Sequence, residues 1–194
     1  IQDFAFRTLP DATVTYDRVI IVPGSASWST ASPKTIDLAV QADREANNIA
    51  TVHLINPTSK SNFGVGINSV GNVLPDGDGT GTQYDDLAIG QAFTPQQVVI
   101  LKGQPLNKET VFALNPGIPK TGASEADKKS VRLVPLSTGL SNFAYPVSVE
   151  FDGDKTPDIA ILHRTSGAET AIYWVPGKGV AALLGKTLTL SGKV

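Results

Sequence analysis

An internal repeat limits what this chain can fold into. The same four-residue core, an aspartate followed by three small or branched apolar residues, occurs at residues 37–40, 86–89 and 158–161. Each copy precedes a second run rich in β-branched residues, at residues 51–56, 97–102 and 171–175, and a further run of this second kind lies at 18–24. Paired short apolar runs that end at Pro or Gly predict strands, so the repeat indicates an all-β protein.

The spacing of the three aspartates predicts β-propeller blades. Asp86 follows Asp37 by 49 residues, and Asp158 follows Asp86 by 72 residues. These intervals bracket the length of a four-stranded propeller blade. Residues 115–130 are rich in turn-forming and charged residues and predict an exposed insertion in the longer interval. We expect about three four-stranded antiparallel blades, at residues 29–60, 61–114 and 131–180, after a partial blade at 1–28.

The loop at residues 150–158 predicts a site for a hard cation. Its carboxylates are Glu150, Asp152, Asp154 and Asp158, and the backbone carbonyl of Thr156 adds another oxygen. Oxygens at alternate positions of a tight turn converge, and they can supply the roughly six to eight oxygens that Ca²⁺ prefers. An ordinary acidic turn is the alternative, because Asp-Gly pairs are common in turns for backbone reasons. Such a turn does not require all four acids.

A second acidic loop lies upstream. Its candidate ligands are Asn72, Asp76, Asp78 and Asp86. Extra residues around the acids leave the first ligand position open, and Asn72 is our choice for it. The corresponding segment at residues 29–37 keeps only Asp37 and carries Lys34, which would repel a cation, so we expect no calcium there. One or two Ca²⁺ ions would have a structural role, because they offset the repulsion among clustered carboxylates.

Neither acidic loop has the pattern of an EF-hand. An EF-hand loop closes with a bidentate Glu at its twelfth position and lies between two helices. The twelfth residue counted from Glu150 is Ile161, and the twelfth counted from Asp76 is Leu87. Each loop leads instead into a short apolar run, which predicts a buried strand.

Composition excludes several classes of partner. The chain has 194 residues, 41% of them hydrophobic, and a formal net charge of −2, so it offers no basic face for nucleic acid. It has no apolar run long enough for a spanning helix and no leader-like segment, so we expect no membrane insertion. It contains no Cys and no Met, which excludes disulfides and thiolate metal sites. Without an initiator Met, we expect a mature or excised piece of a longer protein.

The sequence shows no catalytic centre. His53 and His163 each lie in or beside an apolar strand, which favours a structural role for both. No Gly-x-Ser-x-Gly elbow occurs, and the glycine-rich segment at 77–81 is not followed by Lys-Ser/Thr or by a helix. Asp152 and Asp154 can act as a glycosidase pair only if no ion holds them together. We therefore expect that the protein is not an enzyme.

The motifs resemble the FG-GAP repeats that build the β-propeller of integrin α subunits and of many bacterial surface proteins. That pattern runs from Phe-Gly through an acidic loop to Asp-Leu-Ala-Val-Gly and a strand that ends in Gly. In this chain it is matched by Phe63-Gly64, residues 71–79, 86–90 and 98–103. The next repeat has Phe143, the loop at 150–158 and residues 173–177. The resemblance covers most of residues 15–180.

The resemblance implies a non-enzymatic, calcium-stabilised β-propeller module that binds a protein or glycan in adhesion. Alternatives are a propeller scaffold of a larger secreted enzyme and an architectural subunit of a surface assembly. Propellers usually close with about four to eight blades, so the remaining blades are expected from the parent chain or from a partner chain. Millimolar Ca²⁺ outside cells suits such loops, so the expected location is extracellular or on the cell surface.

Overall fold

The described part of the chain is mostly β-structure. The computed structural model describes residues 3–9, 17–22, 24, 52–55, 61–75, 83–93, 96–104, 110–114, 128–136, 143–164 and 170–191. These residues form three sheets and a short helix. For these residues the expectation of a β-rich fold is therefore confirmed. No helix among these residues is long and apolar enough to cross a membrane.

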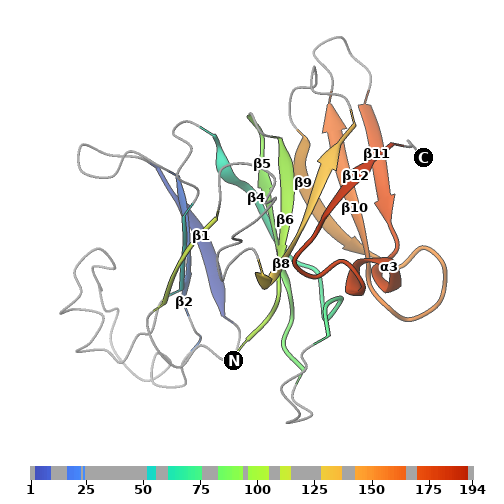
Figure 1. Ribbon diagram of the computed structural model, residues 1–194, viewed down its shortest axis with the longest axis horizontal. Coiled ribbons are helices and arrows are strands. Elements are labelled where there is room, and N and C mark those ends of the chain that lie inside the picture. The colour runs from blue at the N-terminus through green and yellow to red at the C-terminus, as the bar shows by residue number, and fades with distance from the viewer. Residues whose placement is uncertain are drawn as a thin grey trace, which may run out of the picture.

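The three sheets stand side by side, and the central sheet lies between the other two (Figure 1). The N-terminal sheet has the order β1 (Phe4–Thr8), β2 (Arg18–Val22), β3 (Val52–Ile55) and β7 (Thr110–Ala113). The central sheet has the order β12 (Thr187–Leu190), β8 (Ser130–Pro135), β6 (Gln97–Leu101), β5 (Leu87–Gln91) and β4 (Phe63–Ser69). The C-terminal sheet has the order β11 (Thr170–Val175), β10 (Asp158–Arg164) and β9 (Phe143–Val149), and helix α3 (Gly177–Ala181) follows it.

Each sheet contains a three-stranded antiparallel meander, and the three meanders share one register at the start of the first strand. Beyond that point β4 and β9 have a register shift that β1 lacks. The first strands place Phe4, Phe63 and Phe143 opposite Val22, Gln91 and His163 respectively. Each of these partners is the fifth residue after a buried aspartate, namely Asp17, Asp86 or Asp158. The repeat in the sequence is therefore also a repeat in the structure.

The first copy of this repeat differs from the prediction. The sequence predicts that residues 18–24 correspond to the second run of a unit. Arg18–Val22 is instead β2, the middle strand of its meander, and the buried Asp17 directly precedes it. Motif matching misses this copy because Arg-Val-Ile follows Asp17, where the other copies have Leu-Ala-Ile or Ile-Ala-Ile. The predicted copy at residues 37–40 lies outside the described residues.

Two strands pair with a sheet that is formed by earlier residues of the chain. β7 follows the central meander but pairs in parallel with β3 of the N-terminal sheet, and β12 follows the C-terminal meander but pairs in parallel with β8 of the central sheet. The unit predicted at 61–114 therefore divides between two sheets, and the sheets are not purely antiparallel as predicted. The described residues show no closed ring of sheets.

The predicted insertion at residues 115–130 is described only at its end. Ser130 is buried and begins β8, which pairs antiparallel with β6. Residues 115–127 lie outside the described part of the chain.

The central sheet is buried on both faces. Every residue of β6 is buried, as expected for a continuous apolar run in a strand covered on two sides. On one face Val99 packs in a cluster with Val19 of the N-terminal sheet. On the other face Ile100 packs in a cluster with Phe143 and Ile159 of the C-terminal sheet. Two hydrophobic cores therefore join the three sheets.

Candidate metal site and neighbouring pocket

The acidic loop at residues 150–157 connects β9 to β10, the first two strands of the C-terminal meander. The sequence predicts a calcium loop at this position within its unit. Asp158, the first residue of β10, also accepts a hydrogen bond from the main-chain N–H of Gly177 at 2.9 Å. The end of the loop is thereby tied to the start of helix α3.

Three of the four predicted carboxylates lie together. One oxygen from each of Glu150, Asp152 and Asp158 lies within 4.8 Å of the other two. Calcium–oxygen bonds are about 2.3–2.6 Å long, so ligands on opposite sides of one ion are about 5 Å apart. The three carboxylates are therefore close enough to bind a single ion without a large rearrangement of the loop.

The loop backbone supports this arrangement. The N–H of Gly153 donates to Glu150 at 2.8 Å, and the N–H of Asp154 donates to Asp152 at 3.0 Å. Gly153 and Lys155 have positive φ angles of 76° and 69°, so the chain turns sharply around the acidic side chains. Each carboxylate has about four lone-pair sites, so these hydrogen bonds leave acceptor capacity for a cation.

Asp158 is the buried member of the group, with 1% of its surface exposed. Its carboxylate accepts hydrogen bonds from the N–H groups of Gly177 at 2.9 Å and Phe151 at 3.0 Å. Burial by itself raises the pKa of this carboxyl, but hydrogen bonds, led by the one from Gly177, outweigh burial and lower the pKa below its ordinary value. Asp158 is therefore ionised at neutral pH, as a calcium ligand must be.

Asp154 is not a member of this group of three. Its Oδ2 pairs with Nζ of Lys178 on α3 at 2.9 Å, and this contact is the main reason that the pKa of Asp154 is lowered. The N–H of Thr156 donates to the same carboxylate at 2.7 Å. The pair raises the pKa of Lys178, and Asp152 and Glu150 add to that effect. The ammonium group of Lys178 therefore offsets part of the negative charge of the loop.

Asp86 has a second role that no local sequence pattern predicts. Its Oδ2 accepts hydrogen bonds from the N–H groups of Val73 at 2.8 Å and Leu74 at 2.6 Å, and its Oδ1 accepts one from Gly103 at 2.8 Å. Asp158 bonds in the same way to the start of its own loop and to the Gly after its third strand. Both aspartates therefore connect the loop between the first two strands to the end of the third. Cation binding by Asp86 stays a prediction.

The other predicted ligands of the second loop are only partly described. Asn72 is half-buried, one residue after Gly71, whose carbonyl oxygen accepts a hydrogen bond from the N–H of Asp86 at 2.8 Å. Asp76 and Asp78 lie outside the described residues, as does the segment 29–37 with Lys34.

A glycine shortly after the third strand of the meander contacts the buried aspartate in both the central and the C-terminal sheet. A Cβ on Gly177 would collide with the carbonyl oxygen of Pro157, and a Cβ on Gly103 would lie 2.7 Å from the carbonyl oxygen of Asp85. The absence of a side chain allows each N–H to approach the aspartate of its own unit. The sequence signal for this role is a Gly shortly after the second apolar run of each unit, at residues 103 and 177.

His163 has a structural environment. Its ring is fully buried and packs against the rings of Phe143 and Tyr173, with centroids 6.2 and 5.9 Å away. This environment matches the structural role that the sequence predicts. His53 lies in β3, and its side chain is outside the described part of the structure.

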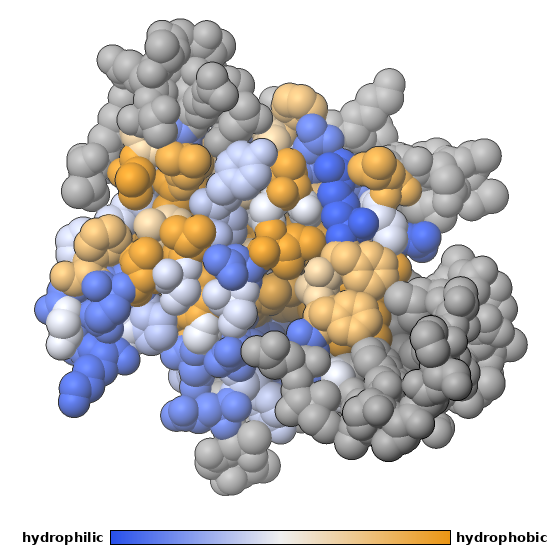
Figure 2. Space-filling model, turned by 180° about the vertical axis from the view of Figure 1, so that it is seen from behind, coloured by the Kyte–Doolittle hydropathy of each residue, from blue (hydrophilic) through white to orange (hydrophobic). Residues whose placement is uncertain are grey.

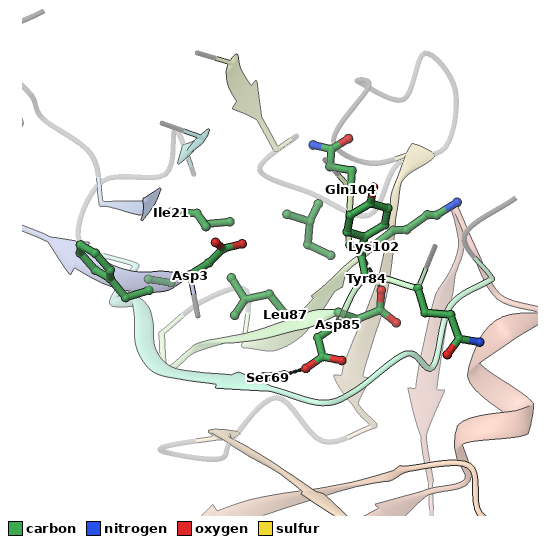
Figure 3. Close-up of a pocket in the computed structure, with 14 residues that line it drawn as sticks. Asp3, Ile21, Ser69, Tyr84, Asp85, Leu87, Lys102 and Gln104 are labelled. Carbon is green, nitrogen blue, oxygen red and sulfur yellow. Dashed lines mark hydrogen bonds between the residues drawn. The ribbon is translucent and has the colours of Figure 1, made fainter. Parts of the chain in front are cut away.

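A pocket of about 530 Å³ opens between the N-terminal and central sheets (Figure 3). Its polar side chains include Asp3, Tyr84, Asp85, Lys102 and Gln104. The hydroxyl of Ser69 donates a hydrogen bond to Asp85 at 3.1 Å. The labelled side chains come from segments far apart in the sequence and surround one hollow. No local sequence pattern predicts this pocket, because it depends on how two sheets pack.

Comparison with known proteins gives no match: no family model, no curated protein and no solved structure is significantly similar to this chain.

Proposed function

We propose that this chain is a non-enzymatic, calcium-stabilised β-sheet module of the FG-GAP propeller type, which binds a protein or glycan outside the cell. The observation that supports the proposal most directly is the convergence of Glu150, Asp152 and Asp158 on the loop between β9 and β10. The acidic loop occupies the same place in its meander as the second acidic loop does between β4 and β5.

Calcium would act here by stabilising the fold. Asp158 already connects the loop to α3 through Gly177, and an ion bound to it would add Glu150 and Asp152 to the same connection. In the absence of an ion, the clustered carboxylates repel one another. Binding to the folded state alone raises the free energy of unfolding by mass action, so the gain in stability would follow the calcium concentration.

Terbium luminescence together with thermal unfolding tests the site. Tb³⁺ occupies calcium sites and emits when a nearby indole absorbs light, and the ring of Trp174 lies 5.8 Å from that of Phe151 in the loop. We expect sensitised emission that Ca²⁺ competes away, and a melting temperature that falls when a chelator is added. The double variant Glu150→Gln, Asp152→Asn should lose both effects.

Asp85→Asn is the control for the loss of an acidic charge outside the cluster. Asp85 is an exposed acid on the other acidic loop, outside the cluster. This variant should keep the emission and the response of the melting temperature to calcium. A wild-type melting temperature that is the same in calcium and in chelator would refute the cation part of the proposal.

The pocket in Figure 3 is the proposed ligand site. Its volume of about 530 Å³ falls within the range of small-molecule sites. Carboxylate and amide groups, such as those of Asp3, Asp85 and Gln104, can accept and donate hydrogen bonds to sugar hydroxyls, while Leu87 and Ile21 offer an apolar wall. This combination suits one or two residues of a neutral glycan.

A glycan array followed by calorimetry tests this assignment. Gln104→Ala and Asp85→Ala should each weaken binding of the selected glycan, while the melting temperature stays unchanged. Leu136→Ala, at an exposed residue outside the pocket, should leave binding intact. Full retention of glycan affinity in both pocket variants would exclude the pocket as the ligand site.

A further inference from the structure

The three sheets follow a common rule for which side chains face which neighbour. In the central sheet, Leu87 and Ile89 pack toward the N-terminal sheet, while Ala88 between them packs toward the C-terminal sheet. In the C-terminal sheet, Ile159 and Ile161 pack toward the central sheet. Residues one and three after the aspartate therefore face the preceding sheet, and residues two and four face the following one.

By this rule, one face of the C-terminal sheet has no sheet against it among the described residues. Leu162 of β10 pairs with Tyr145 of β9 and Ile172 of β11, forming one row across this outer face. Ala160 pairs with Val147 and Trp174 in the adjacent row. The exposed fractions of Tyr145, Val147, Leu162 and Ile172 lie between 42% and 45%. Such a group of large apolar side chains indicates an interaction surface.

The corresponding face of the central sheet shows what such a surface contacts. Val98 and Ile100 occupy the positions that Ile172 and Trp174 occupy in the C-terminal sheet, as the pairings with Gly90 and Ala88 show. Both are fully buried, in the cluster that contains Phe143 from the start of β9. A Cβ on Gly90 would collide with the carbonyl oxygen of Ala144. The first strand of the following sheet therefore lies directly on this face.

The same contact joins the N-terminal and central sheets. Phe63 begins β4, the first strand of the central sheet, and packs fully buried in the cluster with Val19 of β2. A Cβ on the next residue, Gly64, would lie 2.7 Å from the side chain of Val19. At both internal junctions, a phenylalanine that starts a first strand is buried against the preceding sheet.

The N-terminal sheet carries the same phenylalanine, and the described residues include no sheet that precedes it. Phe4 begins β1 and lies opposite the fifth residue after Asp17, the register in which Phe63 and Phe143 lie in their own sheets. Phe63 and Phe143 are fully buried, whereas 45% of Phe4 is exposed. Ile20 and Val22, on the same face of the sheet, are already buried within this chain, and Phe6 is partly buried. Phe4, which also borders the pocket of Figure 3, is therefore the exposed residue of that face among those described. Apolar side chains are open to solvent on the molecular surface (Figure 2).

We propose that two copies of this chain associate head to tail, with β1 and Phe4 of one copy packed on the outer face of the C-terminal sheet of the other. The occupant is a second copy because the described residues present an exposed first-strand phenylalanine on the N-terminal sheet and an exposed apolar face on the C-terminal sheet, and these are the two kinds of surface that meet at both internal junctions. The contact is heterologous, so it continues into rings or filaments. It is independent of the proposed cation site.

Sedimentation velocity over micromolar to millimolar concentrations tests the proposal. We expect reversible association of the wild-type protein that does not stop at a dimer. Phe4→Glu and Leu162→Glu should each weaken it about tenfold or more, because each places a charge in an apolar contact. Leu136→Glu changes an exposed leucine outside both surfaces and should associate like the wild type. Circular dichroism and melting curves show whether each variant remains folded.

Mixing the two variants separates head-to-tail contacts from a symmetric pairing of outer faces. The Phe4→Glu chain keeps its outer face and the Leu162→Glu chain keeps Phe4, so together they should form a heterodimer that grows no further. The chain has no cysteine, so Phe4→Cys mixed with Ile172→Cys should give an oxidised heterodimer, and Phe4→Cys mixed with Leu136→Cys should not. A wild-type protein that is monomeric throughout, or a Phe4→Glu variant that associates normally, would overturn the proposal.

Discussion

Replacing Asp86 with alanine removes the acceptor of three main-chain hydrogen bonds. The N–H groups of Val73, Leu74 and Gly103 donate to it at 2.8, 2.6 and 2.8 Å, and the carboxylate itself is 1% exposed. A buried donor left without an acceptor costs about 1–3 kcal/mol. Three such losses total about 3–9 kcal/mol if they add. We expect the lower part of this range, about 3–5 kcal/mol, because water can enter from the adjoining pocket and bond to some of the N–H groups.

The expected loss is a large fraction of the stability of a single domain, which is typically about 5–15 kcal/mol. For a chain of this size it corresponds to a decrease in melting temperature of about 6–20 °C. Asp86→Asn keeps one acceptor oxygen and should lose about half as much free energy as the alanine variant. Urea unfolding followed by tryptophan fluorescence measures both variants, and an unchanged m-value shows that the transition is comparable.

Asp85→Ala is the matched control for Asp86→Ala. The Asp85 side chain is exposed and accepts a bond from Ser69, so its loss should change the free energy of unfolding by no more than about 0.5 kcal/mol. All measurements are made in calcium and in chelator. If Asp86 acts mainly as a cation ligand, its replacement will destabilise the protein only when calcium is present. That result, or a loss in chelator no larger than the Asp85 loss, would contradict the hydrogen-bond argument.

Three further predictions concern the C-terminal loop and helix. Chelation should lower the melting temperature by about 3–10 °C, because a site with a dissociation constant near 0.1–1 mM contributes about 1.4–2.7 kcal/mol at 10 mM Ca²⁺; differential scanning calorimetry measures the shift. Gly177→Ala should destabilise the protein by about 1–3 kcal/mol, since the new Cβ meets the Pro157 carbonyl. Gly179→Ala is the control, because the space around its Cβ is open, and it should stabilise α3 by up to about 1 kcal/mol. Equal effects of the two variants in urea unfolding would contradict the packing argument. Lys178→Gln should tighten cation binding about threefold or more, because the ammonium group competes with the ion for Asp154; weaker binding by calorimetry would mean that Lys178 instead positions Asp154.

The strands that follow the repeated aspartates could be predicted from the sequence. β5, β6, β10 and β11 match the predicted runs because each is a short apolar segment bounded by polar residues or Gly, and a buried strand needs little more than that pattern. The grouping of acidic side chains in the loop between β9 and β10 was predictable for a similar reason, since these residues are close in sequence. Features that depend only on neighbouring residues are therefore predictable from the sequence.

What the sequence did not predict depends on distant contacts. The parallel pairings of β7 with β3 and of β12 with β8 join segments separated by dozens of residues, and no periodicity in either strand specifies its partner. The role of Asp86 as a main-chain acceptor depends on Gly103 reaching it from the end of β6. The ion pair between Asp154 and Lys178 depends in turn on α3, a five-residue helix in a glycine-rich segment where no sequence pattern predicts a helix.

β7 and β12 are synthesised long after the strands with which they pair, and this order has consequences for folding during synthesis and for mechanical strength. A nascent chain cannot complete its N-terminal sheet until residue 113 has left the ribosome, and it cannot complete the central sheet until residue 190 has followed. Such long-range closure is slow, so early strand edges stay open during translation and are natural targets for chaperones. A force applied to the C-terminal end would first peel β12 from the central sheet, so mechanical failure would begin in the middle layer of the molecule.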